Sequence, residues 1–450
     1  MDLLEENYDD YLAWLFKHSN TIVKRETSVL YYDCSNFYFE SERPDEDVID
    51  EVTGEILKGM RQYGFSKEHR PNPIVEMGLF MDSRGIPITM CLHPGNTSEQ
   101  LTAIPLERDV MKMLPGAKFI YCADAGLGSY NIRKFNSMGG RAFIVTQSIK
   151  KMSNVLKQSV FNDYDYRLLS NDKPVTIAEM KSFDRFEEKN RKQYNDFAYK
   201  VVEADKVLDL GLYEDVTLKN GRTVKRKAKG VLKQRIIITF SRKVMEYQRT
   251  VRSRQIERAK KLLESKDPEE IKKGPNDVKR FLKRTAKTKS GETAVVEYIL
   301  DKDKISEEEK YDGYYAVATN LQDPAKEILA VSNKRYQIEE CFRIMKTNFD
   351  GRPVNHRLRE RIRAHFLICY TALLVYRLLE AQLDDQGTHV TANDLITTLK
   401  NMNVANVHDV EYMALYNGSK ALDALTRLTM LPLDRLHYRP KELNSMIKKF

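Results

Sequence analysis

Short β-rich runs alternate with helical patterns between residues 28 and 146, and this order constrains the fold more than any other feature of the sequence. The run SVLYYDCSNFYFE at 28–40 reads as β-rich on both sides of a turn at Ser35-Asn36. Further strands and helices are predicted in the order strand, strand, helix, strand, helix, strand, at 73–81, 87–93, 98–114, 118–123, from 129, and 142–146. Such an order is typical of a mixed α/β layer.

The rest of the chain divides by pattern around this layer. Residues 151–310 mix short β-like runs with a long Lys/Arg-rich helical pattern, so we interpret them as a β-rich and helical insertion that interrupts the α/β core of 29–150 and 311–385. The second core part contains a strand at Tyr314–Thr319 and strong helical patterns at Ile328–Asn348 and Arg361–Leu383. We expect residues 1–28 and 386–450 to be helical.

Positive charge is concentrated in the insertion. Between Gly221 and Ser290 there are 24 Lys and Arg against 7 Asp and Glu, an excess of 17 that exceeds the whole chain's +9. A basic block of this density indicates a polyanionic partner, most plausibly nucleic acid. A solvated helical face, as at Arg249–Lys261, is the other interpretation, and charge alone leaves the two about even.

Several classes of protein are disfavoured. The apolar run at Ala364–Tyr376 is shorter than the roughly 20 residues that span a bilayer, so no membrane segment is expected. Five cysteines lie far apart without a CxxC pair, which suits a reducing cytosol and argues against a zinc knuckle. No Gly-Lys-Ser/Thr phosphate loop occurs, so no nucleotide cofactor is expected.

Three acids occupy positions where catalytic carboxylates are often held. Asp33 follows a strand of β-branched and aromatic residues, and Asp124 ends an apolar strand just before a Gly-rich turn. Glu339 lies on the helical pattern after the last core strand, and Arg335, Arg343 and Lys346 share its face by spacing. Each acid also has an ordinary structural interpretation, as a turn residue, a helix cap or an i,i+4 ion pair.

Three carboxylates are what two-metal phosphoryl transfer requires. Mg²⁺ (or Mn²⁺) prefers oxygen ligands, and the two ions in such sites lie about 3.5–4 Å apart. We assign Asp33 as the bridging ligand, Asp124 to one ion and Glu339 to the other.

In these pieces the sequence resembles the insertion-sequence DDE transposases of the cut-and-paste type. Arg335, Glu339 and Lys346 fit the Arg-x3-Glu-x6-Lys part of that group's signature, whose tyrosine would fall at Ser332. Other matching pieces are YYDCSNFYFE, GIPITMCLHPGNTSE, CADAGLGSYNI, DGYYAVATN and RPVNHRLRERIRAHFLICY. The resemblance runs from about Leu30 to Leu379, apart from the insertion, and implies a ribonuclease-H-like core.

The resemblance also implies roles and partners. Arg335 and Lys346, with Arg343 beside them, would contact phosphates near the scissile bond of double-stranded DNA. Tyr315 takes the place of an aromatic residue that can stack on a flipped base, although packing in the core is its more ordinary role. The implied activity is metal-dependent cleavage at transposon ends and strand transfer into target DNA, by a homodimer on DNA in a prokaryotic cytoplasm, at the nucleoid.

Two other functions stay open. Relatives usually carry a helical DNA-binding region before the first acid, whereas Asp33 here lies close to the start. A truncated chain of this kind could act as a regulatory, DNA-binding or dimerising inhibitor of transposition. A structure-selective nuclease on the same fold is the second alternative.

Overall fold

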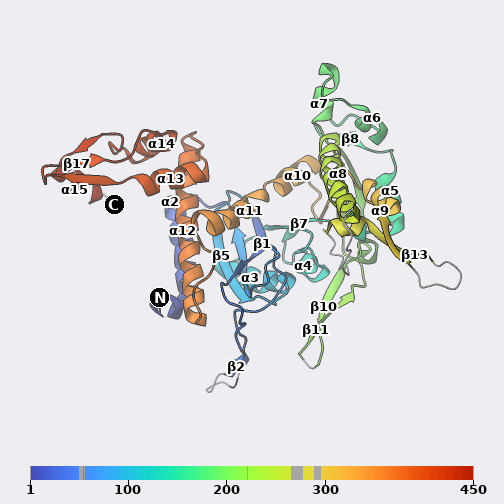
Figure 1. The fold of residues 1–450 in the computed structure, drawn as a ribbon, viewed down its shortest axis with the longest axis horizontal. Helices are drawn as coiled ribbons and strands as arrows, with labels where there is room; N and C mark the ends of the chain where they lie inside the picture. The colour runs from blue at the N-terminus through green and yellow to red at the C-terminus, as the bar shows by residue number, and fades with distance from the viewer. Residues whose placement is uncertain are drawn as a thin grey trace. The chain divides into compact units, whose positions relative to one another are not determined.

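A computed structural model describes residues 2–49, 54, 56–219, 221–264, 277–287 and 295–448 of the chain. These residues form two compact units, each with its own sheet strands and helices (Figure 1). Unit 1 comprises Met1–Leu127, Phe135–Ala142 and Val331–Phe450, and unit 2 comprises Gly128–Lys134 and Phe143–Ala330. The two units are described separately below.

The sheet strands of unit 1 are organised around β1 (Val29–Tyr38). β4 (Ile74–Met81) pairs with β1 in the antiparallel sense, and β5 (Pro87–Pro94) pairs with β4 in the same way. On the other side of β1, β6 (Ile120–Ala123) runs parallel to it. The strand order is therefore β5-β4-β1-β6. All eight residues of β4 are buried, as expected for an apolar strand covered on both faces.

The predicted turn at Ser35-Asn36 is wrong, because both residues continue β1 as one uninterrupted strand. Ser35 pairs with Met77 and Asn36 with Glu76 across the ladder to β4, and both are buried. The Asn36 amide donates to the Phe65 carbonyl at 3.0 Å, so burial leaves its side chain satisfied. Pairing with a complete neighbouring strand outweighs the local turn preference of these two residues.

The remaining core elements are confirmed close to their predicted bounds. They are the β4–β5 hairpin, α3 (Glu99–Met113), β6, α4 (Tyr130–Phe135) and β7 (Ala142–Thr146). Helices at Ala325–Asn333 and Arg359–Asp385 follow these elements. Together they make the chain a mixed α/β protein. Hydrophobic periodicity located these elements because each buries one face or both.

The helical pattern predicted at Ile328–Asn348 is divided into three pieces. α10 (Ala325–Asn333) ends before Lys334-Arg335, α11 (Tyr336–Arg343) follows, and η5 (Ile344–Asn348) is a π-helical turn. Around the break the amides of Arg335 and Ile338 donate to carbonyls three residues back, which is a tighter pattern than the α-helix. The chain passes from unit 2 to unit 1 within α10.

α12 (Arg359–Asp385) is the central helix of unit 1 and packs on α1 (Asp2–Glu6), α2 (Tyr8–Ile22) and β5. Within the described ranges it is the one helix long and apolar enough to cross a membrane by length and composition. However, 56% of its most apolar window is buried inside the protein, which is a property of core helices as well.

The C-terminal segment contains the expected helices and also a small sheet that the sequence did not predict. The helices are α13 (Ala392–Asn401), α14 (Lys420–Thr429) and α15 (Pro440–Ile447). Three short antiparallel strands lie between them, β16 (Val404–Val407), β17 (Glu411–Ala414) and β18 (His437–Tyr438). Most of their side chains are exposed or half-buried, so they leave only a weak hydrophobic pattern.

Unit 2 has its own run of strands in the order β7-β15-β12-β9-β8. β15 (Tyr314–Thr319) pairs antiparallel with β7 and with β12 (Arg235–Phe240), and β12 pairs with β9 (Ala198–Glu203). β12 and β9, which belong to the predicted insertion, thus extend the sheet beyond β15. The remaining paired strands are β8 (Arg167–Leu168), β10 (Tyr213–Thr217), β11 (Thr223–Lys227), β13 (Leu282–Lys287) and β14 (Val295–Leu300).

The long helical pattern of the insertion is confirmed as α8 (Arg242–Glu264). Shorter helices surround it in the sequence, α5 (Asn154–Phe161), α6 (Ile177–Ser182), α7 (Arg191–Tyr194) and α9 (Lys302–Glu309). Parts of the basic block predicted between Gly221 and Ser290, at 265–276 and 288–290, lie outside the described residues.

A buried ion pair joins α2 to the β4–β5 turn in unit 1. Arg25 Nε donates to Asp82 Oδ2 at 2.6 Å, and both side chains are almost inaccessible to solvent. Arg25 also donates to Ser19 and to the carbonyls of Ile86 and Pro87. Breaking such a pair leaves a buried charge without its partner, which typically costs about 3–5 kcal/mol.

We therefore expect Asp82→Ala to lower the free energy of unfolding of unit 1 by about 3–5 kcal/mol. Urea unfolding followed by the fluorescence of Trp14, the only tryptophan, reports this unit directly. Asp385→Ala is the control, because Asp385 pairs with Arg84 at a site where Asp385 is 59% exposed, and its loss should cost below about 1 kcal/mol. Equal losses in the two variants would contradict the role given to the buried pair.

Candidate catalytic site

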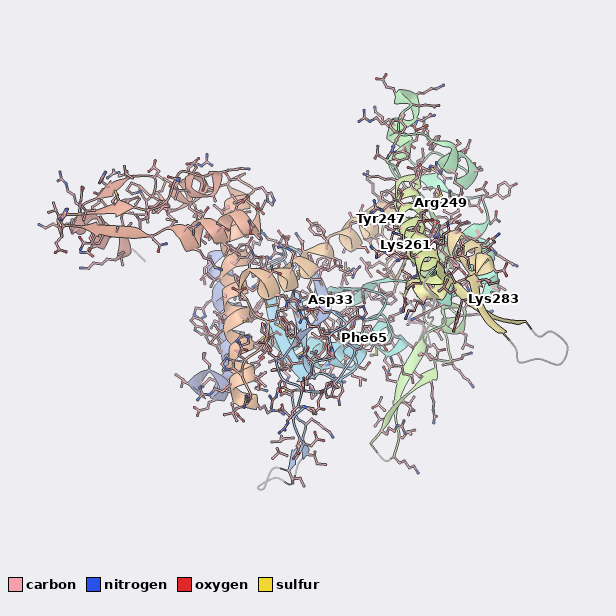
Figure 2. The ribbon with its side chains drawn as sticks, in the orientation of Figure 1. Asp33, Phe65, Tyr247, Arg249, Lys261 and Lys283 are labelled. Atoms are coloured by element: carbon pink, nitrogen blue, oxygen red, sulfur yellow. The ribbon has the colours of Figure 1, made fainter. Side chains whose placement is uncertain are left out.

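Asp33 lies near the middle of β1, where the sheet buries most of its surroundings (Figure 2). Its Oδ1 accepts a hydrogen bond from the Cys34 amide at 2.8 Å. Burial, together with the negative charge of Asp124, raises the pKa of Asp33 to about 7, although Lys67 and Arg335 oppose the rise. A partly buried carboxyl with a pKa near neutrality is a common feature of functional sites.

Asp124 directly follows β6, the strand that runs parallel to β1. Its Oδ1 accepts hydrogen bonds from the amides of Gly126 at 2.8 Å and Leu127 at 3.0 Å, so this oxygen holds the turn. Within the described part of the chain, no group donates to Oδ2. Asp124 therefore fulfils the turn role expected of such a residue and still presents one oxygen for a ligand.

Lys67 is a cation at this site that the sequence analysis missed. Its Nζ donates to the Cys34 carbonyl at 2.6 Å and to Glu99 Oε1 at 2.7 Å. Burial alone would lower the pKa of Lys67, but the charges of Asp33 and Glu99 raise it above its ordinary value. Lys67 is thus a fixed positive charge beside Asp33. No local pattern indicated it, because the contact joins residues far apart in the sequence.

Glu76 is a second acid that the sequence did not indicate. It lies on β4 opposite Asn36 and is only 3% exposed. Burial and the charge of Glu99 raise its pKa to about 8, against the opposing effect of Lys67. The environment of Glu76 therefore favours its protonated form, and Lys67 acts against this effect.

Glu339 lies in the first turn of α11, and its side chain is 63% exposed. Its carboxylate pairs with Arg335, whose Nη1 lies 3.9 Å from Glu339 Oε1. Arg335 also lowers the pKa of Asp33, so one guanidinium interacts with both acids. Arg335 thus connects the helix acid to the strand acid.

The prediction that Arg335, Glu339, Arg343 and Lys346 share one helical face is wrong for Lys346, whereas Arg343 keeps its predicted place one turn after Glu339 in α11. Arg343 is half exposed and pairs with Glu340 at 3.4 Å. Lys346 lies in the π-helical turn, and its Nζ donates to Ser35 Oγ at 2.7 Å and lies over the Phe37 ring at 5.1 Å. The extra residue of the π turn rotates Lys346 away from the Glu339 face and toward β1.

The surroundings of Lys346 also lower its pKa. Burial, together with the positive charge of Lys67, lowers its pKa to about 8, although Glu76 and Asp33 act in the opposite direction. Lys346 Nζ lies 3.5 Å from Glu68 Oε1, and Glu68 also pairs with Arg352. Lys346 is thus part of the Asp33 site, on the side of β1.

Tyr315 lies on β15 in unit 2, and the ordinary role considered for it, packing in the core, is not what the structure shows. Its side chain is 38% exposed, and its hydroxyl shares a hydrogen bond of 2.6 Å with Thr146 Oγ1. The ring therefore presents part of its face to solvent.

A divalent metal ion such as Mg²⁺ requires oxygen donors held close together. Asp33 and Asp124 suit it, because they are oxygen donors close enough for the charge of one to raise the pKa of the other. Across the described ranges, no group of three or more His, Cys, Asp or Glu side chains has the spacing of a metal site. Glu339, paired with Arg335, lies outside the pair formed by the two aspartates.

The raised pKa of Asp33 predicts a stability effect with a defined pH dependence. A carboxyl whose pKa is higher in the folded state than in the unfolded state destabilises the fold increasingly as pH rises between the two values, here from about 4 to about 7. Asp33→Asn should therefore raise the unfolding temperature at pH 8 in EDTA, and the gain should shrink toward pH 5. Asp109→Asn, at a half-exposed surface pair, is the control and should show no such trend. A gain independent of pH would contradict the assignment.

Comparison with known proteins places this geometry in a family. The model of the Transposase DDE domain matches residues 58–375, more than half of the chain, a span that includes Asp124 and Glu339 and begins after Asp33. A search of curated proteins gave no match. Among solved structures, the chain is similar to a cryo-EM structure of a piggyBac transposase synaptic complex with hairpin DNA, at 7% identity and a TM-score of 0.38. That alignment covers 96% of this chain and 59% of the other, so the chain spans about three fifths of that neighbour, and a similarity this low supports no further argument. The family match decides the assignment: the chain belongs to the Transposase DDE domain family.

Proposed function

We propose that this chain cleaves DNA at transposon ends and transfers the resulting 3′ ends into target DNA by metal-dependent phosphodiester chemistry. Membership of the Transposase DDE domain family supports the reaction class. The observation that carries the proposal is the proximity of Asp33 and Asp124. Each lies two residues beyond the Tyr31–Cys122 pair of neighbouring parallel strands, and the charge of Asp124 raises the pKa of Asp33. Like charges held together in this way are what a divalent cation would stabilise.

We propose Asp33, Asp124 and Glu339 as the ligands of two Mg²⁺ or Mn²⁺ ions, with Asp33 shared between them. When bound, the ions would supply a nucleophile at neutral pH and stabilise the leaving oxygen. Glu339 would complete the set by exchanging Arg335 for metal, and its exposed side chain leaves room for this movement. In the absence of metal, the positive charge of Lys67 opposes the rise in the pKa of Asp33.

The cations around the acids are proposed to hold the DNA. Arg335, released from Glu339, would contact a phosphate next to the scissile bond, and Arg343 would reach a second from its half-exposed position. Lys346 is buried against Ser35, so we assign it to positioning β1, the strand that carries Asp33. It would contact a phosphate only where the DNA backbone comes close to this strand. Tyr315 is proposed to stack on an unpaired base through its exposed ring face.

The chain is proposed to act as a homodimer on duplex DNA, with the basic insertion lying along the DNA backbone. Two alternatives are kept. The chain could bind DNA or a longer relative without cleaving, as a regulator of transposition, or it could cleave branched DNA without strand transfer. The proximity of Asp33 and Asp124 favours a catalytic role over the first alternative, because a regulator needs no two acids held close together.

Cleavage of a transposon-end duplex with Mg²⁺ or Mn²⁺ tests the proposal. Asp124→Asn and Glu339→Gln should each lower the rate by at least about 100-fold while leaving DNA affinity unchanged, because each removes a ligand and keeps the shape. Glu340→Gln is the matched control, since Glu340 neighbours Glu339 but pairs with Arg343 and Arg377, and it should keep most of the activity. Loss of activity in Glu340→Gln with retention in Glu339→Gln would overturn the ligand assignment.

The products and a mixing experiment separate the alternatives. A transposase yields joined species with target DNA, whereas a structure-selective nuclease yields free ends alone. Adding the chain to an active relative of the same element should not reduce strand transfer if the proposal holds. A dose-dependent fall in the yield of joined product, with no cleavage by the chain alone, would establish the regulatory function instead.

A further inference from the structure

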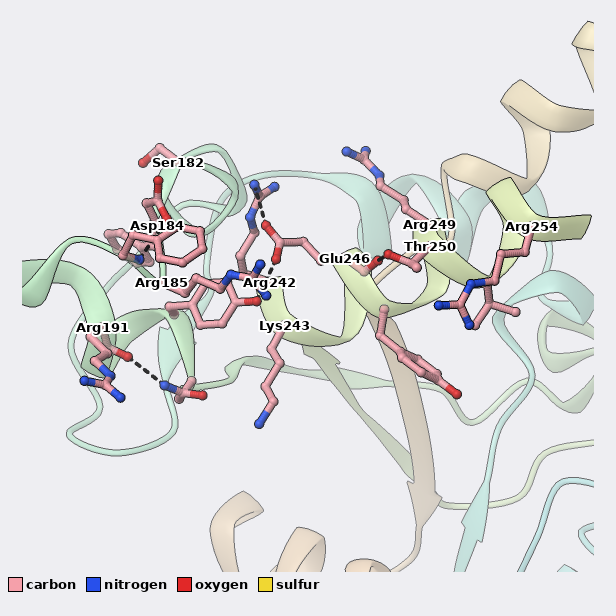
Figure 3. A pocket seen from close by; sticks show the side chains of 16 residues that line it. Ser182, Asp184, Arg185, Arg191, Arg242, Lys243, Glu246, Arg249, Thr250 and Arg254 are labelled. Carbon is pink, nitrogen blue, oxygen red and sulfur yellow. Dashed lines mark hydrogen bonds and ion pairs between the residues drawn. The ribbon is translucent and has the colours of Figure 1, made fainter. Parts of the chain in front are cut away.

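A groove in unit 2 lies outside everything assigned above. It has a volume of about 1290 Å³ and is formed by the N-terminal half of α8 and by the segment that joins α6 to α7 (Figure 3). Its size exceeds the roughly 300–1,000 Å³ of pockets that enclose small molecules. The charged side chains that line it are Arg185, Arg191, Arg242, Lys243, Arg249, Arg254, Asp184 and Glu246.

The two acids of the groove are already engaged. Glu246 Oε1 pairs with Arg242 at 2.9 Å, and Glu246 Oε2 accepts from the Tyr194 hydroxyl at 2.6 Å, contacts that Figure 3 marks with dashed lines. Asp184 Oδ1 accepts the Phe186 amide at 2.9 Å. These contacts fix the wall of the groove and leave it with a positive excess.

Several cations of the groove have no anionic partner. In the part of the chain that the structure describes, no carboxylate pairs with Arg191, Lys243 or Arg254. Lys243 and Arg254 extend from α8, and Arg191 from the facing segment (Figure 3). Lys243, Tyr247 and Arg254 are spaced four and seven residues apart, so they share one face of α8 over about 16 Å, at about 1.5 Å per residue. A row of unpaired cations of this length fits a chain of phosphates rather than a single anion.

Aromatic rings alternate with these cations. Tyr247 is 70% exposed between Lys243 and Arg254, and Phe186 is 81% exposed on the opposite wall. The Arg185 guanidinium lies 4.6 Å from the centre of the Phe186 ring. A single exposed ring needs no partner, but Tyr247 and Phe186 line the same groove from its two walls. Their faces match the faces of nucleic-acid bases, on which stacking is tolerant of sequence.

We propose that this groove binds a segment of single-stranded DNA, with its phosphates along Lys243, Arg191 and Arg254 and its bases on Tyr247 and Phe186. Duplex DNA would satisfy the cations but not the rings, because its bases are stacked inside the helix. The choice of DNA rests on the proposed function. The groove itself, its charge and its exposed rings do not depend on the catalytic acids.

Fluorescence anisotropy of a labelled 12-nucleotide oligo-dT, in EDTA so that no cleavage occurs, tests the assignment. Tyr247→Ala should weaken binding by about 5- to 100-fold, the range expected for loss of one stacked base. Tyr247→Phe should retain wild-type affinity, because the ring face is kept. Lys243→Ala should reduce the slope of log Kd against log salt by about 0.7, as for one phosphate contact on a single strand, whereas Tyr247→Ala should leave this slope unchanged.

Matched controls come from the same unit. Tyr213→Ala removes a ring that is 46% exposed on β10, and Lys261→Ala removes an exposed cation of α8 beyond the groove. Neither should change oligo-dT affinity as Tyr247→Ala and Lys243→Ala do. Tyr247→Ala and the wild type should bind an abasic 12-mer with equal affinity, and a hairpin duplex likewise. Neither of these two nucleic acids offers an unstacked base.

Three results would overturn the proposal. They are unchanged oligo-dT binding in folded Tyr247→Ala, an equal loss in Tyr213→Ala, and an equal loss of abasic or duplex binding in Tyr247→Ala. The outcome is independent of cleavage. If cleavage fails but Tyr247 governs oligo-dT binding, the groove stands and the catalytic proposal falls; if cleavage proceeds while Tyr247→Ala binds normally, the groove alone falls.

Discussion

Unit 1 depends on keeping an ionisable carboxyl, Asp33, on a central strand whose surroundings are apolar. A charge in such a place is costly unless opposite charges compensate for it, and Lys67 and Arg335 do so from two different directions. The arrangement fixes more than the acid. Lys67 must reach across to Glu99 at the start of α3, and Arg335 must lie at the break before α11. The positions of these two elements therefore decide which positive charges act on one carboxylate.

Local pattern predicted the order of core elements, and its failures have a common cause. β4, β5, β6 and β7 were located because their apolar runs reflect burial that is continuous along the strand. Ser35-Asn36 was misread because pairing with β4 decides its conformation, and that pairing is invisible in a window of a few residues. The small sheet of β16, β17 and β18 was missed because its exposed strands leave no periodic signal.

The acids could be predicted, whereas the groups that set their properties could not. Asp33 and Asp124 stand at strand positions that local pattern identifies, and Glu339 stands at a fixed spacing from Arg335. Lys67 and Glu76 reach the site only through tertiary structure, and no spacing rule connects them to Asp33. Sequence therefore indicates which residues could react, and the fold decides at what pH they are charged. The DNA groove of unit 2 has the same character, since its two walls come from segments about 60 residues apart.

The π turn at Ile344–Asn348 makes the length of the chain between Glu339 and Lys346 part of the site. Each residue of an α-helix advances the side chain by about 100°, so seven residues would return Lys346 nearly to the direction of Glu339. The wider turn diverts Lys346 to Ser35 instead, while α12 still follows with its packing intact. A related chain with a regular α-helix here would keep every signature letter at the same spacing and yet place its lysine on the Glu339 side. For this segment, aligning letters is not the same as aligning positions in space.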